Sequence, residues 1–457
     1  MRRDLFARGE TAVIGIGRSG RAVARLAARE GAQVHVSDAA DDEGKRQTAD
    51  ELRAIGVEVE LGRHDLDRIA RAGLVIVSPG VPPDAAPLAR ARKACVPVMS
   101  EVEVALAFLP DTRCIVVTGT NGKSTVTALV AHLLRAARAD AVAAGNIGTA
   151  LSEIALLPDP PPWVALEISS FQLHDTPGIR PAVGVLTNLA PDHLDRYASV
   201  DDYYADKDRL FRNAGADSTW VTNADDVEVQ RRTARVVGAH RRFSINGLDV
   251  EASYERGTGV LRLLGERFLT RDEVRLFGDH NLANVLAAAL AVAVADSTFA
   301  APGVRGRLAT GVRSFTALEN RLEVVLEAGG VLWINDSKAT NVSAARVAIE
   351  GMTRPAVVLL GGRHKGEPYT ALIPALLQHA KLVIAYGEAG PEIERDLAGH
   401  VALERLESSF EEVIALARAR TAPGDAVLLS PACSSFDMFR NYEERGDAFR
   451  RLARAPR

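Results

Sequence analysis

A phosphate-binding pattern begins in the apolar stretch that ends at Val117. Residues 116–125 read Val-Val-Thr-Gly-Thr-Asn-Gly-Lys-Ser-Thr. The β-branched run before the turn predicts a buried strand, and Lys-Ser-Thr predicts the start of an amphipathic helix that runs through Leu134. A strand, a glycine turn and a helix N-terminus together present backbone N–H groups to an anion. Lys123 would face the β- and γ-phosphates and Ser124 would offer a hydroxyl to Mg²⁺, so the segment predicts a nucleoside triphosphate site.

This pattern departs from the common G-x-x-x-x-G-K-[ST] sequence at its first position. Val117 stands where the first glycine is expected, and Gly119 supplies a shorter turn. A chance Gly-Lys-Ser in a loop is the alternative interpretation. The strand before the turn and the helix after it favour the nucleotide interpretation.

A second glycine pattern lies near the N-terminus. Residues 15–20 form a complete G-x-G-x-x-G, and Asp38 ends the next expected strand. This arrangement is typical of dinucleotide-binding turns, in which a helix end receives phosphate and the acid binds a ribose hydroxyl. A turn that needs glycine only for packing is the alternative. Residues 78–80 (Ser-Pro-Gly) follow another strand, and they either line the same crevice or form an ordinary turn.

Acidic residues and a histidine follow two strands downstream of the phosphate-binding pattern. Glu167 ends an apolar strand, where a Mg²⁺ ligand for a triphosphate is expected. His193 lies between Asp192 and Asp195 at another strand end, which suggests a second metal site or a proton relay. Lys207 lies in a polar segment, and its surroundings alone predict an exposed surface lysine.

Three polar runs follow three apolar strands in the last third of the chain. They are residues 335–341 (Asn-Asp-Ser-Lys-Ala-Thr-Asn), 361–366 and 430–437. Because strand ends of a parallel sheet meet at one edge, these runs predict a ligand site along that edge. A helix N-cap formed by Asp336 or Ser337 is the alternative for the first run.

The spacing of apolar segments predicts an α/β protein of three domains. Strands are expected at 11–14, 33–37, 74–77, 114–117, 163–167, 183–187, 322–326, 331–335, 357–360, 382–386 and 426–429, with hairpins within 236–277. Helices are expected at 20–30 and 281–295. This alternation predicts mainly parallel sheets covered by helices. The chain of 457 residues is also too long for one ordinary core.

The composition excludes several classes of protein. The net charge of −4 and the absence of a block of basic residues argue against nucleic-acid binding. No apolar run approaches the ~20 residues of a membrane span, and the charged start of the chain is unlike a secretory signal. Three widely spaced cysteines fit a reduced, cytoplasmic protein.

Taken together, these motifs resemble those of the Mur ligase family. The matching stretches are residues 118–125, 145–148, 167–172, 192–197, 280–284, 335–341 and 430–435, in the family order over essentially the whole chain. The first stretch alone indicates the wider superfamily, which includes folylpolyglutamate synthases. The pair 335–341 and 430–435 resembles the branch that adds D-glutamate.

The resemblance implies an N-terminal Rossmann-like domain for a UDP-sugar (1–101), a central P-loop ATPase-like domain (102–316) and a C-terminal Rossmann-like, amino-acid-binding domain (317–457). It implies an ATP-dependent ligase that joins D-glutamate to UDP-N-acetylmuramoyl-L-alanine through an acyl phosphate, in peptidoglycan precursor synthesis. ATP and Mg²⁺, at two sites, are the implied cofactors. We expect a monomer without nucleic-acid or membrane partners.

The resemblance also implies roles for individual residues. Catalytic roles fall to Lys123, Glu167, His193 and Lys207. ATP contacts fall to Gly119, Thr120, Asn121, Gly122, Lys123, Ser124, Thr125, Asn284, Arg321 and Asp336. UDP-sugar contacts fall to Ser19, Asp38, Gly80, Asn146 and His193. D-glutamate contacts fall to Lys338, Thr340, Lys365, Ser435, Phe436 and Tyr442. Metal ligands are Ser124, Glu167, His193 and Lys207, the last as a carbamate.

Four positions depart from what is familiar in the family. Arg18 takes a slot that is usually apolar, and Ala40 stands where a basic residue would help to bind uridine. Asn320 replaces a histidine, and His364 replaces an acid before Lys365. If His364 is protonated, the amino-acid pocket becomes more cationic.

Two other classes of function compete with this interpretation. A sister ligase could add a different amino acid, or could add glutamate to a folate. An NAD-dependent oxidoreductase could be built on residues 15–20, but this would leave the second phosphate-binding pattern unexplained.

Overall fold

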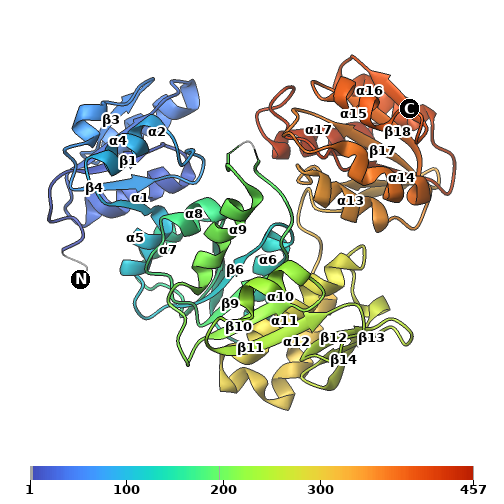
Figure 1. Ribbon diagram of the computed structural model, residues 1–457, viewed down its shortest axis with the longest axis horizontal. Helices are drawn as coiled ribbons and strands as arrows, with labels where there is room; N and C mark the ends of the chain where they lie inside the picture. Colours follow the sequence, from blue (N-terminus) through green and yellow to red (C-terminus); the bar gives the residue numbers. More distant parts are fainter. Residues whose placement is uncertain (1–3, 195, 456–457) are drawn as a thin grey trace. The chain divides into compact units, whose positions relative to one another are not determined.

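The computed structural model describes residues 4–194 and 196–455 and has three sheets in chain order (Figure 1). Each sheet lies within one of the three predicted domain ranges, which confirms the three-domain α/β prediction. The residue boundaries 1–101, 102–316 and 317–457 remain predictions.

The chain forms two compact units. The first consists of Met1–Leu189, Asp201–Leu269 and Val285–Val312, and contains the first two sheets. The second consists of Ala190–Val200, Thr270–Asn284 and Arg313–Arg457, and contains the third sheet.

The first sheet is entirely parallel and has the strand order β3-β2-β1-β4-β5. Its strands are β1 (Thr11–Ile14), β2 (Val34–Asp38), β3 (Glu58–Leu61), β4 (Leu74–Val77) and β5 (Val98–Ser100), and its helices are α1 (Arg18–Arg29), α2 (Glu43–Arg53), α3 (Leu66–Ile69) and α4 (Ala86–Lys93). The strand order reverses between β1 and β4, and this is the place where open α/β sheets bind their ligands.

The second sheet has the order β14-β13-β12-β11-β10-β9-β6-β8-β7. Its strands are β6 (Arg113–Thr118), β7 (Ala141–Gly145), β8 (Trp163–Glu167), β9 (Val183–Leu186), β10 (Thr219–Asn223), β11 (Ala239–Ser244), β12 (Ala252–Glu255), β13 (Val260–Leu263) and β14 (Glu266–Thr270). β12 and β13 form the expected hairpin, but β11 and β12 are parallel, so the prediction of hairpins throughout 236–277 was partly wrong.

Helices and short 3₁₀ turns connect and cover these strands. They are α5 (Glu101–Ala107), α6 (Lys123–Ala136), α7 (Leu151–Ala155), α8 (Ser170–His174), α9 (Val200–Asp208), η1 (Arg209–Phe211), α10 (Val227–Thr233), η2 (Arg271–Glu273), α11 (His280–Ala295), η3 (Ser297–Ala300) and α12 (Pro302–Ser314). Strand β6 is buried along Cys114 to Thr118, as expected for a central parallel strand covered on both faces.

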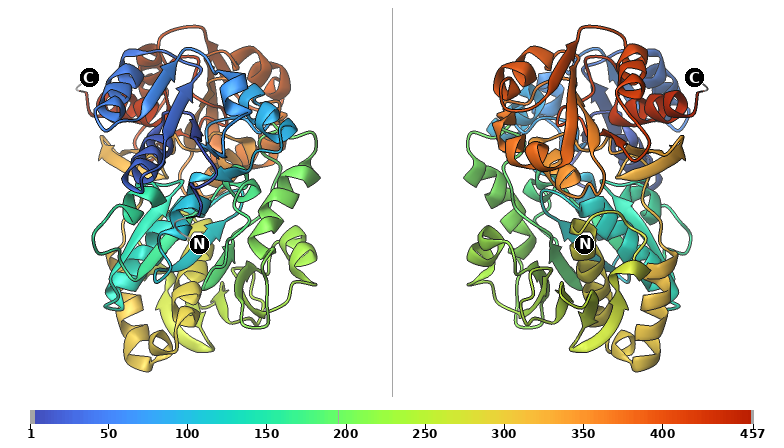
Figure 2. Two further views of the ribbon diagram at one scale, coloured as in Figure 1. Left: turned by 90° about the vertical axis from the view of Figure 1, so that its left-hand side faces the viewer. Right: turned by 90° about the vertical axis from the view of Figure 1, so that its right-hand side faces the viewer.

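The third sheet has the order β15-β16-β20-β17-β18-β19, with β15 antiparallel. Its strands are β15 (Glu323–Ala328), β16 (Val331–Asn335), β17 (Ala356–Gly361), β18 (Ala380–Tyr386), β19 (Leu403–Leu406) and β20 (Ala426–Leu429). Its helices are α13 (Val342–Glu350), η4 (Tyr369–Leu372), α14 (Ile373–His379), α15 (Gly390–Leu397), α16 (Phe410–Ala419) and α17 (Tyr442–Arg454). Helices cover both faces of this sheet (Figure 2): residues of α13, α14 and α15 belong to one core cluster, and residues of α16 and α17 to the other.

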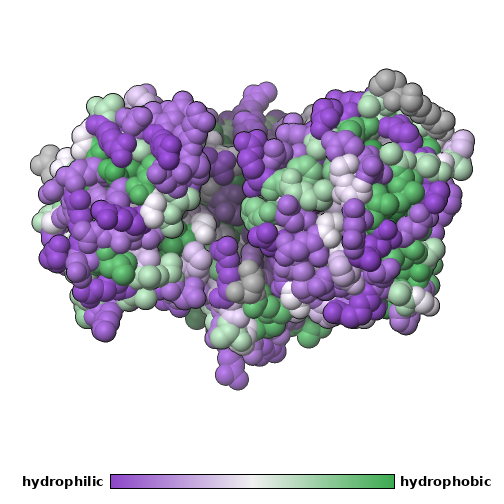
Figure 3. Space-filling model, turned by 90° about the horizontal axis from the view of Figure 1, so that it is seen from above, coloured by the Kyte–Doolittle hydropathy of each residue, from purple (hydrophilic) through white to green (hydrophobic). Residues whose placement is uncertain are grey.

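Hydrophilic residues predominate on the face shown in Figure 3, and hydrophobic residues form small, separate groups there. Among the described residues, no helix combines the length and the apolar character that crossing a membrane requires.

Candidate active site

The phosphate-binding turn joins β6 to α6 in the first unit. Gly119 has φ +142°, and a Cβ there would lie 2.0 Å from Thr187 Oγ1. Gly122 precedes the helix in the left-handed conformation with φ +81°. Glycine is therefore needed at both positions, for the close approach at the first and for the backbone conformation at the second. Lys123, Ser124 and Thr125 occupy the first turn of α6, so the predicted strand–turn–helix is confirmed.

Two residues from the end of β9 hold this turn in shape. The backbone N–H of Asn121 donates to Asn188 Oδ1 at 2.9 Å, and Asn188 Nδ2 donates to Asn121 O at 3.0 Å. Thr187 Oγ1 donates to the same carbonyl at 2.7 Å. No local sequence pattern marks Thr187 or Asn188, because their partner Asn121 lies more than 60 residues away in the chain.

Lys123 lies against the turn. Its Nζ donates to Gly119 O at 3.0 Å and to Thr120 O at 2.7 Å. The ammonium group is therefore held beside the backbone that would surround a phosphate. This position fits the predicted role of Lys123 as a cation for the triphosphate.

Glu167 lies at the same edge of the sheet as the turn. β6 and β8 are adjacent and parallel, with Val117 opposite Glu167. The carboxyl group is buried, with 1% of the residue exposed, as is Ser124. Asn146 Nδ2 donates to Glu167 Oε1 at 2.9 Å. A buried carboxylate and a serine hydroxyl at one edge of a sheet suit a Mg²⁺ ion that also binds phosphate oxygens.

Lys207 is buried, contrary to the surface position that its local sequence predicted. Only 1% of the residue is exposed. Its Nζ donates to Gly119 O at 2.7 Å and lies 4.5 Å from the centre of the Tyr203 ring. The helix α9 thus brings Lys207 to the phosphate-binding turn, where the resemblance to Mur ligases predicted it. A long-range contact of this kind leaves no pattern in the local sequence.

A cavity of about 510 Å³ lies beside the glycine turn of residues 15–20 in the first unit. Ser19, Asp38, Gly80 and Asn146, four of the predicted UDP-sugar contacts, all line it. Arg18, Lys45 and His64 also line the cavity. The structure thus brings residues of the first and second sheets together around one space.

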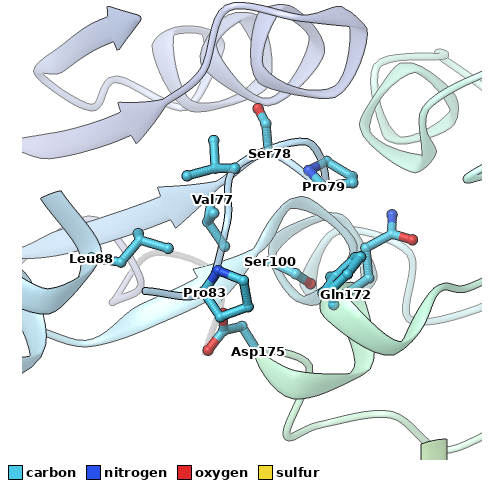
Figure 4. Close-up of a pocket in the computed structure, with 10 residues that line it drawn as sticks. Val77, Ser78, Pro79, Pro83, Leu88, Ser100, Gln172 and Asp175 are labelled. Atoms are coloured by element: carbon cyan, nitrogen blue, oxygen red, sulfur yellow. The ribbon is translucent and has the colours of Figure 1, made fainter. Parts of the chain in front are cut away.

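Residues 78–80 (Ser-Pro-Gly) line this cavity as well, which confirms the crevice interpretation, and they form a turn in which Val81 N–H donates to Ser78 O at 3.0 Å. Ser78 is buried, and its hydroxyl donates to Gly15 O at 2.9 Å, which fixes the glycine turn. Figure 4 shows Gln172 of α8 across a smaller cavity of about 10 Å³ from Ser78 and Pro79. Gln172 Oε1 accepts hydrogen bonds from the N–H and the hydroxyl of Ser169, each at 3.0 Å, and these orient its amide.

His193 belongs to the second unit, and so does Asp192 beside it. His193 has φ +57°, which is unusual for a residue with a side chain. Asp192 Oδ1 accepts the N–H of His193 at 2.9 Å, and Asp192 Oδ2 accepts Asn341 Nδ2 at 2.8 Å. Two predicted motifs therefore meet in space. Asp195 lies outside the described residues.

Asn341 also decides how α13 begins. Its side chain accepts Ala344 N at 2.7 Å and caps the helix. The alternative interpretation, a cap formed by Asp336 or Ser337, was therefore wrong. Asp336 instead accepts the hydroxyl of Ser430 at 3.0 Å and the N–H of Leu322 at 3.2 Å. Burial raises the pKa of the Asp336 carboxyl to about 7, against the opposing effect of these hydrogen bonds and of Arg321.

The segment around Arg321 is conformationally constrained. Its neighbours Asn320 and Leu322 have φ values of +62° and +42°. Asn320 is buried and accepts Asn335 Nδ2 at 2.8 Å through its side chain. This amide pair explains why asparagine fits where the family often has histidine. Asn284, the third predicted ATP contact in this unit, donates to Asn281 Oδ1 at 2.8 Å.

The predicted amino-acid-binding residues all lie in the second unit, next to the adjacent strands β16, β20 and β17. Lys365 Nζ donates to Thr340 Oγ1 at 3.3 Å, and Lys338 Nζ lies 4.9 Å from the centre of the Tyr442 ring. Ser435 is buried, whereas Phe436 is 62% exposed. The predicted convergence of three strand ends is confirmed, and the contacts with D-glutamate remain a prediction.

Arg445 ties these three strand ends together, and the sequence analysis missed it. The side chain is fully buried, with 0% exposed. Its guanidinium donates to Ser337 Oγ, Ser337 O, Gly361 O, Cys433 O and Ser434 O, at 2.8–3.4 Å. Arginine offers five N–H donors in a fixed plane, which suits this role. Its position near the C-terminus, in a segment of several arginines, did not distinguish it in the sequence.

Among residues 4–194 and 196–455, no group of three or more His, Cys, Asp or Glu side chains is placed to hold a metal ion.

Comparisons with known proteins identify the family of this chain. Three family models match the chain: "Mur ligase MurD-like, N-terminal domain" at residues 9–100, "Mur ligase middle domain" at 117–292 and "Mur ligase, glutamate ligase domain" at 320–433. The chain therefore belongs to the Mur ligase family.

Two relatives resemble the whole chain, and both are named UDP-N-acetylmuramoylalanine–D-glutamate ligase. The one from Acidobacterium capsulatum is 40% identical over 97% of this chain and 96% of its own. The one from Salinibacter ruber is 39% identical over 99% of both chains. The crystal structure of UDP-N-acetylmuramate-alanine ligase MurC from Thermotoga maritima has the same fold, with a TM-score of 0.62 and 20% identity over 98% of this chain and 100% of that chain.

Proposed function

We propose that this protein is an ATP-dependent ligase that joins D-glutamate to UDP-N-acetylmuramoyl-L-alanine. The carboxylate of the nucleotide-linked substrate attacks the γ-phosphorus of ATP, the bond to the β,γ-bridging oxygen breaks, and an acyl phosphate and ADP are formed. The amine of D-glutamate then attacks the activated carbonyl, and phosphate leaves. The reaction belongs to peptidoglycan precursor synthesis, and we propose that the protein carries it out in the cytoplasm as a monomer.

The hydrogen bond between Asn146 and Glu167 is the observation that best supports this proposal. Asn146 lines the cavity beside the first glycine turn, and Glu167 lies beside the phosphate-binding turn. A ligase that activates a carboxyl group with ATP must bring these two substrates together. The 2.9 Å contact joins their predicted sites within one unit.

The charges around the phosphate-binding turn fit phosphoryl transfer, which depends mainly on positioning and on neutralising charge. Lys123 and the N-terminus of α6 would hold the triphosphate, with Gly119 to Thr125 surrounding it. Ser124 and Glu167 would hold Mg²⁺, which supplies positive charge to the transferring group. A second Mg²⁺, with Lys207 as a ligand, is part of the proposal.

The carbamate of Lys207 fits the position of this side chain. An ammonium group with 1% of its residue exposed is costly. Carbamylation would turn it into a carboxylate-like ligand beside the phosphate-binding turn. The carbamate oxygens would then ligate a metal ion, whereas the ammonium group would repel it.

D-glutamate is proposed to bind in the second unit, near Lys338, Thr340, Lys365, Ser435, Phe436 and Tyr442. Its two carboxylates need cations and hydroxyl donors. Lys365 and Thr340 are already paired at 3.3 Å, and Lys338 is the second cation of this group.

The test is an assay of phosphate release with ATP and UDP-N-acetylmuramoyl-L-alanine against a panel of amino acids. D-glutamate should support turnover, whereas L-alanine and meso-diaminopimelate should not. Turnover with either of these, and none with D-glutamate, would assign the protein to a sister ligase. Tight NAD binding without any effect of ATP would favour an oxidoreductase instead.

A further inference from the structure

One end of the cavity beside the first glycine turn contains an ion pair that the proposed function has not used. Lys45 Nζ lies 2.5 Å from Asp38 Oδ1, and both side chains line the cavity. The Lys45 side chain is 30% exposed and that of Asp38 is 13% exposed. Lys45 comes from α2, the helix that follows β2 and Asp38.

Asp38 is held in its charged form. Burial raises the pKa of its carboxyl, but hydrogen bonds from Lys45 and from the N–H groups of Ile16 and Ala40 more than offset this, so the pKa lies below its usual value. Asp38 is therefore only an acceptor, and Lys45 is only a donor. The pair presents an acceptor next to a donor.

The position of the pair within the cavity indicates which part of a UDP-sugar it meets. The helix α1 begins at the glycine turn, so its N-terminus marks the diphosphate end. Asn146 contacts Glu167 and marks the end where the carboxyl group reacts. An acid at the end of the second strand of such a fold lies by the nucleoside. Lys45, beside Asp38, therefore belongs to the nucleoside end.

Resting on the proposed function, we infer that Lys45 is a specificity-determining residue that donates a hydrogen bond to an oxygen of the substrate's uridine. Lysine has three N–H donors, and Asp38 accepts one of them. The oxygen is a uracil carbonyl or a ribose hydroxyl. Each of these oxygens can accept from Lys45, and a neighbouring N–H or O–H group can donate to Asp38. Lys45 would thereby supply the positive charge that is missing at Ala40.

His64 supports the same assignment from another segment. Its Nδ1 lies 2.8 Å from Ser37 Oγ, and the ring lines the cavity. Burial lowers the pKa of the His64 imidazole, against the opposing effect of Asp38 and Glu60. The ring is therefore a neutral polar group that lines the same cavity and adds no positive charge to that of Lys45.

The experiment compares Lys45→Met with Arg46→Ala by calorimetric titration of UDP. Arg46 is the next residue of the same helix, and it pairs with Asp41 in an exposed position, so it serves as a matched control. Lys45→Met should weaken UDP binding by about 10- to 100-fold, the usual range for a lost hydrogen bond to a charged group. Arg46→Ala should bind UDP like the unchanged protein.

Titrations with other nucleotides identify the substrate oxygen that Lys45 contacts. If Lys45 contacts the base, the preference for UDP over CDP should fall in Lys45→Met. If it contacts the ribose, the preference for UDP over 2′-deoxy-UDP should fall. Inhibition by inorganic diphosphate should stay the same.

Equal UDP affinity in Lys45→Met and the unchanged protein would overturn the inference and leave the proposed function intact. An equal loss of diphosphate and UDP affinity would overturn the assignment to the nucleoside. If the unchanged protein binds no UDP, the proposed function itself fails. The thermal unfolding temperature of each variant separates these outcomes from misfolding, because Asp38 keeps its bonds to Ile16 and Ala40.

Discussion

The side-chain amide of Asn146 donates a hydrogen bond to Glu167 Oε1 at 2.9 Å. Asn146 follows β7 and Glu167 ends β8, two neighbouring parallel strands. Gly145, the last residue of β7, lies opposite Glu167 and has φ +101°, and a Cβ there would lie 2.2 Å from Glu167 O. The backbone and the side chains together therefore hold one predicted substrate contact against one predicted metal ligand.

Replacing Asn146 with alanine should impair both substrates at once. Glu167 would lose a donor that orients its buried carboxyl group, and the cavity would lose an amide. We expect kcat to fall by about 10- to 100-fold and KM for the UDP-linked substrate to rise, measured by phosphate release. Asn246→Ala, in an exposed turn, is the control. An effect on KM for ATP alone would contradict this prediction.

Replacing Lys123 with alanine should lower kcat by at least about 100-fold, because a cation is lost where charge develops on the transferring phosphoryl group. The fold should survive, since the N-terminal turn of α6 does not depend on this side chain. Steady-state kinetics and circular dichroism check both points, with Lys93→Ala on α4 as the control. Near-normal kcat would refute the assignment of ATP to this turn.

Replacing Lys207 with alanine should abolish most of the activity, and short carboxylic acids should restore part of it. A small carboxylate can occupy the space of a carbamate, whereas it cannot replace an ammonium group. The measurement is the rate of phosphate release with increasing formate or acetate. The same acids added to Lys123→Ala are the control, because there they should have no effect. Rescue by amines instead of acids would show that the uncharged or protonated lysine is the working form.

Replacing Gly119 with alanine should damage the phosphate-binding turn. The added Cβ would collide with Thr187 Oγ1, and a φ of +142° disfavours any side chain. Strain of about 1–3 kcal/mol is typical of such positions. We expect weaker ATP binding in a calorimetric titration. Gly257→Ala should bind ATP normally, since nothing lies within 4 Å of a Cβ there; equal affinities in the two variants would contradict the steric argument.

Replacing Glu101 with glutamine should stabilise the protein above neutral pH. Burial raises the pKa of Glu101 to about 7, although the N–H of Ser152 donates to it at 2.5 Å. An unfolded glutamate titrates near 4.3. Between these two pKa values the folded state holds the Glu101 proton more tightly than the unfolded state does. The free energy of unfolding therefore falls as pH rises through this window. Below it both states are protonated, and the cost disappears.

The unfolding temperature of Glu101→Gln should therefore exceed that of the unchanged protein at pH 8 and differ less at pH 5. The gain at pH 8 is at most about 4 kcal/mol. Exposed Glu43→Gln at the start of α2 should change little at either pH. A lower unfolding temperature at pH 8 would show that the Glu101 carboxylate stabilises the fold.

Strongly apolar strands were predictable from the sequence. The structure has β1, β4, β8, β16 and β20 at the residues expected for them, because each is a short run of β-branched or aliphatic residues next to a turn. The short or polar strands β3, β5, β7, β10 and β19 were not predicted. Four of these, β3, β5, β7 and β19, lie at sheet edges, where partial exposure weakens the apolar signal.

The candidate site was predictable where one motif contains both the backbone turn and the functional side chain. Residues 118–125 and 15–20 are of this kind. Lys45, Asn188 and Arg445 were missed, since each acts on a partner that comes from another segment. The burial of Lys207 was likewise invisible in its polar surroundings, and only the resemblance to known ligases placed it near the phosphate-binding turn.

The five hydrogen bonds of Arg445 have a practical consequence for protein engineering. One guanidinium anchors three loops, so lengthening any one of them would disturb the other two. Insertion of a peptide tag or a fluorophore attachment site is better directed to the turn at Leu264 and Gly265, between β13 and β14 on the outer edge of the second sheet. A label placed there would report on the intact molecule without loosening the loops that Arg445 joins.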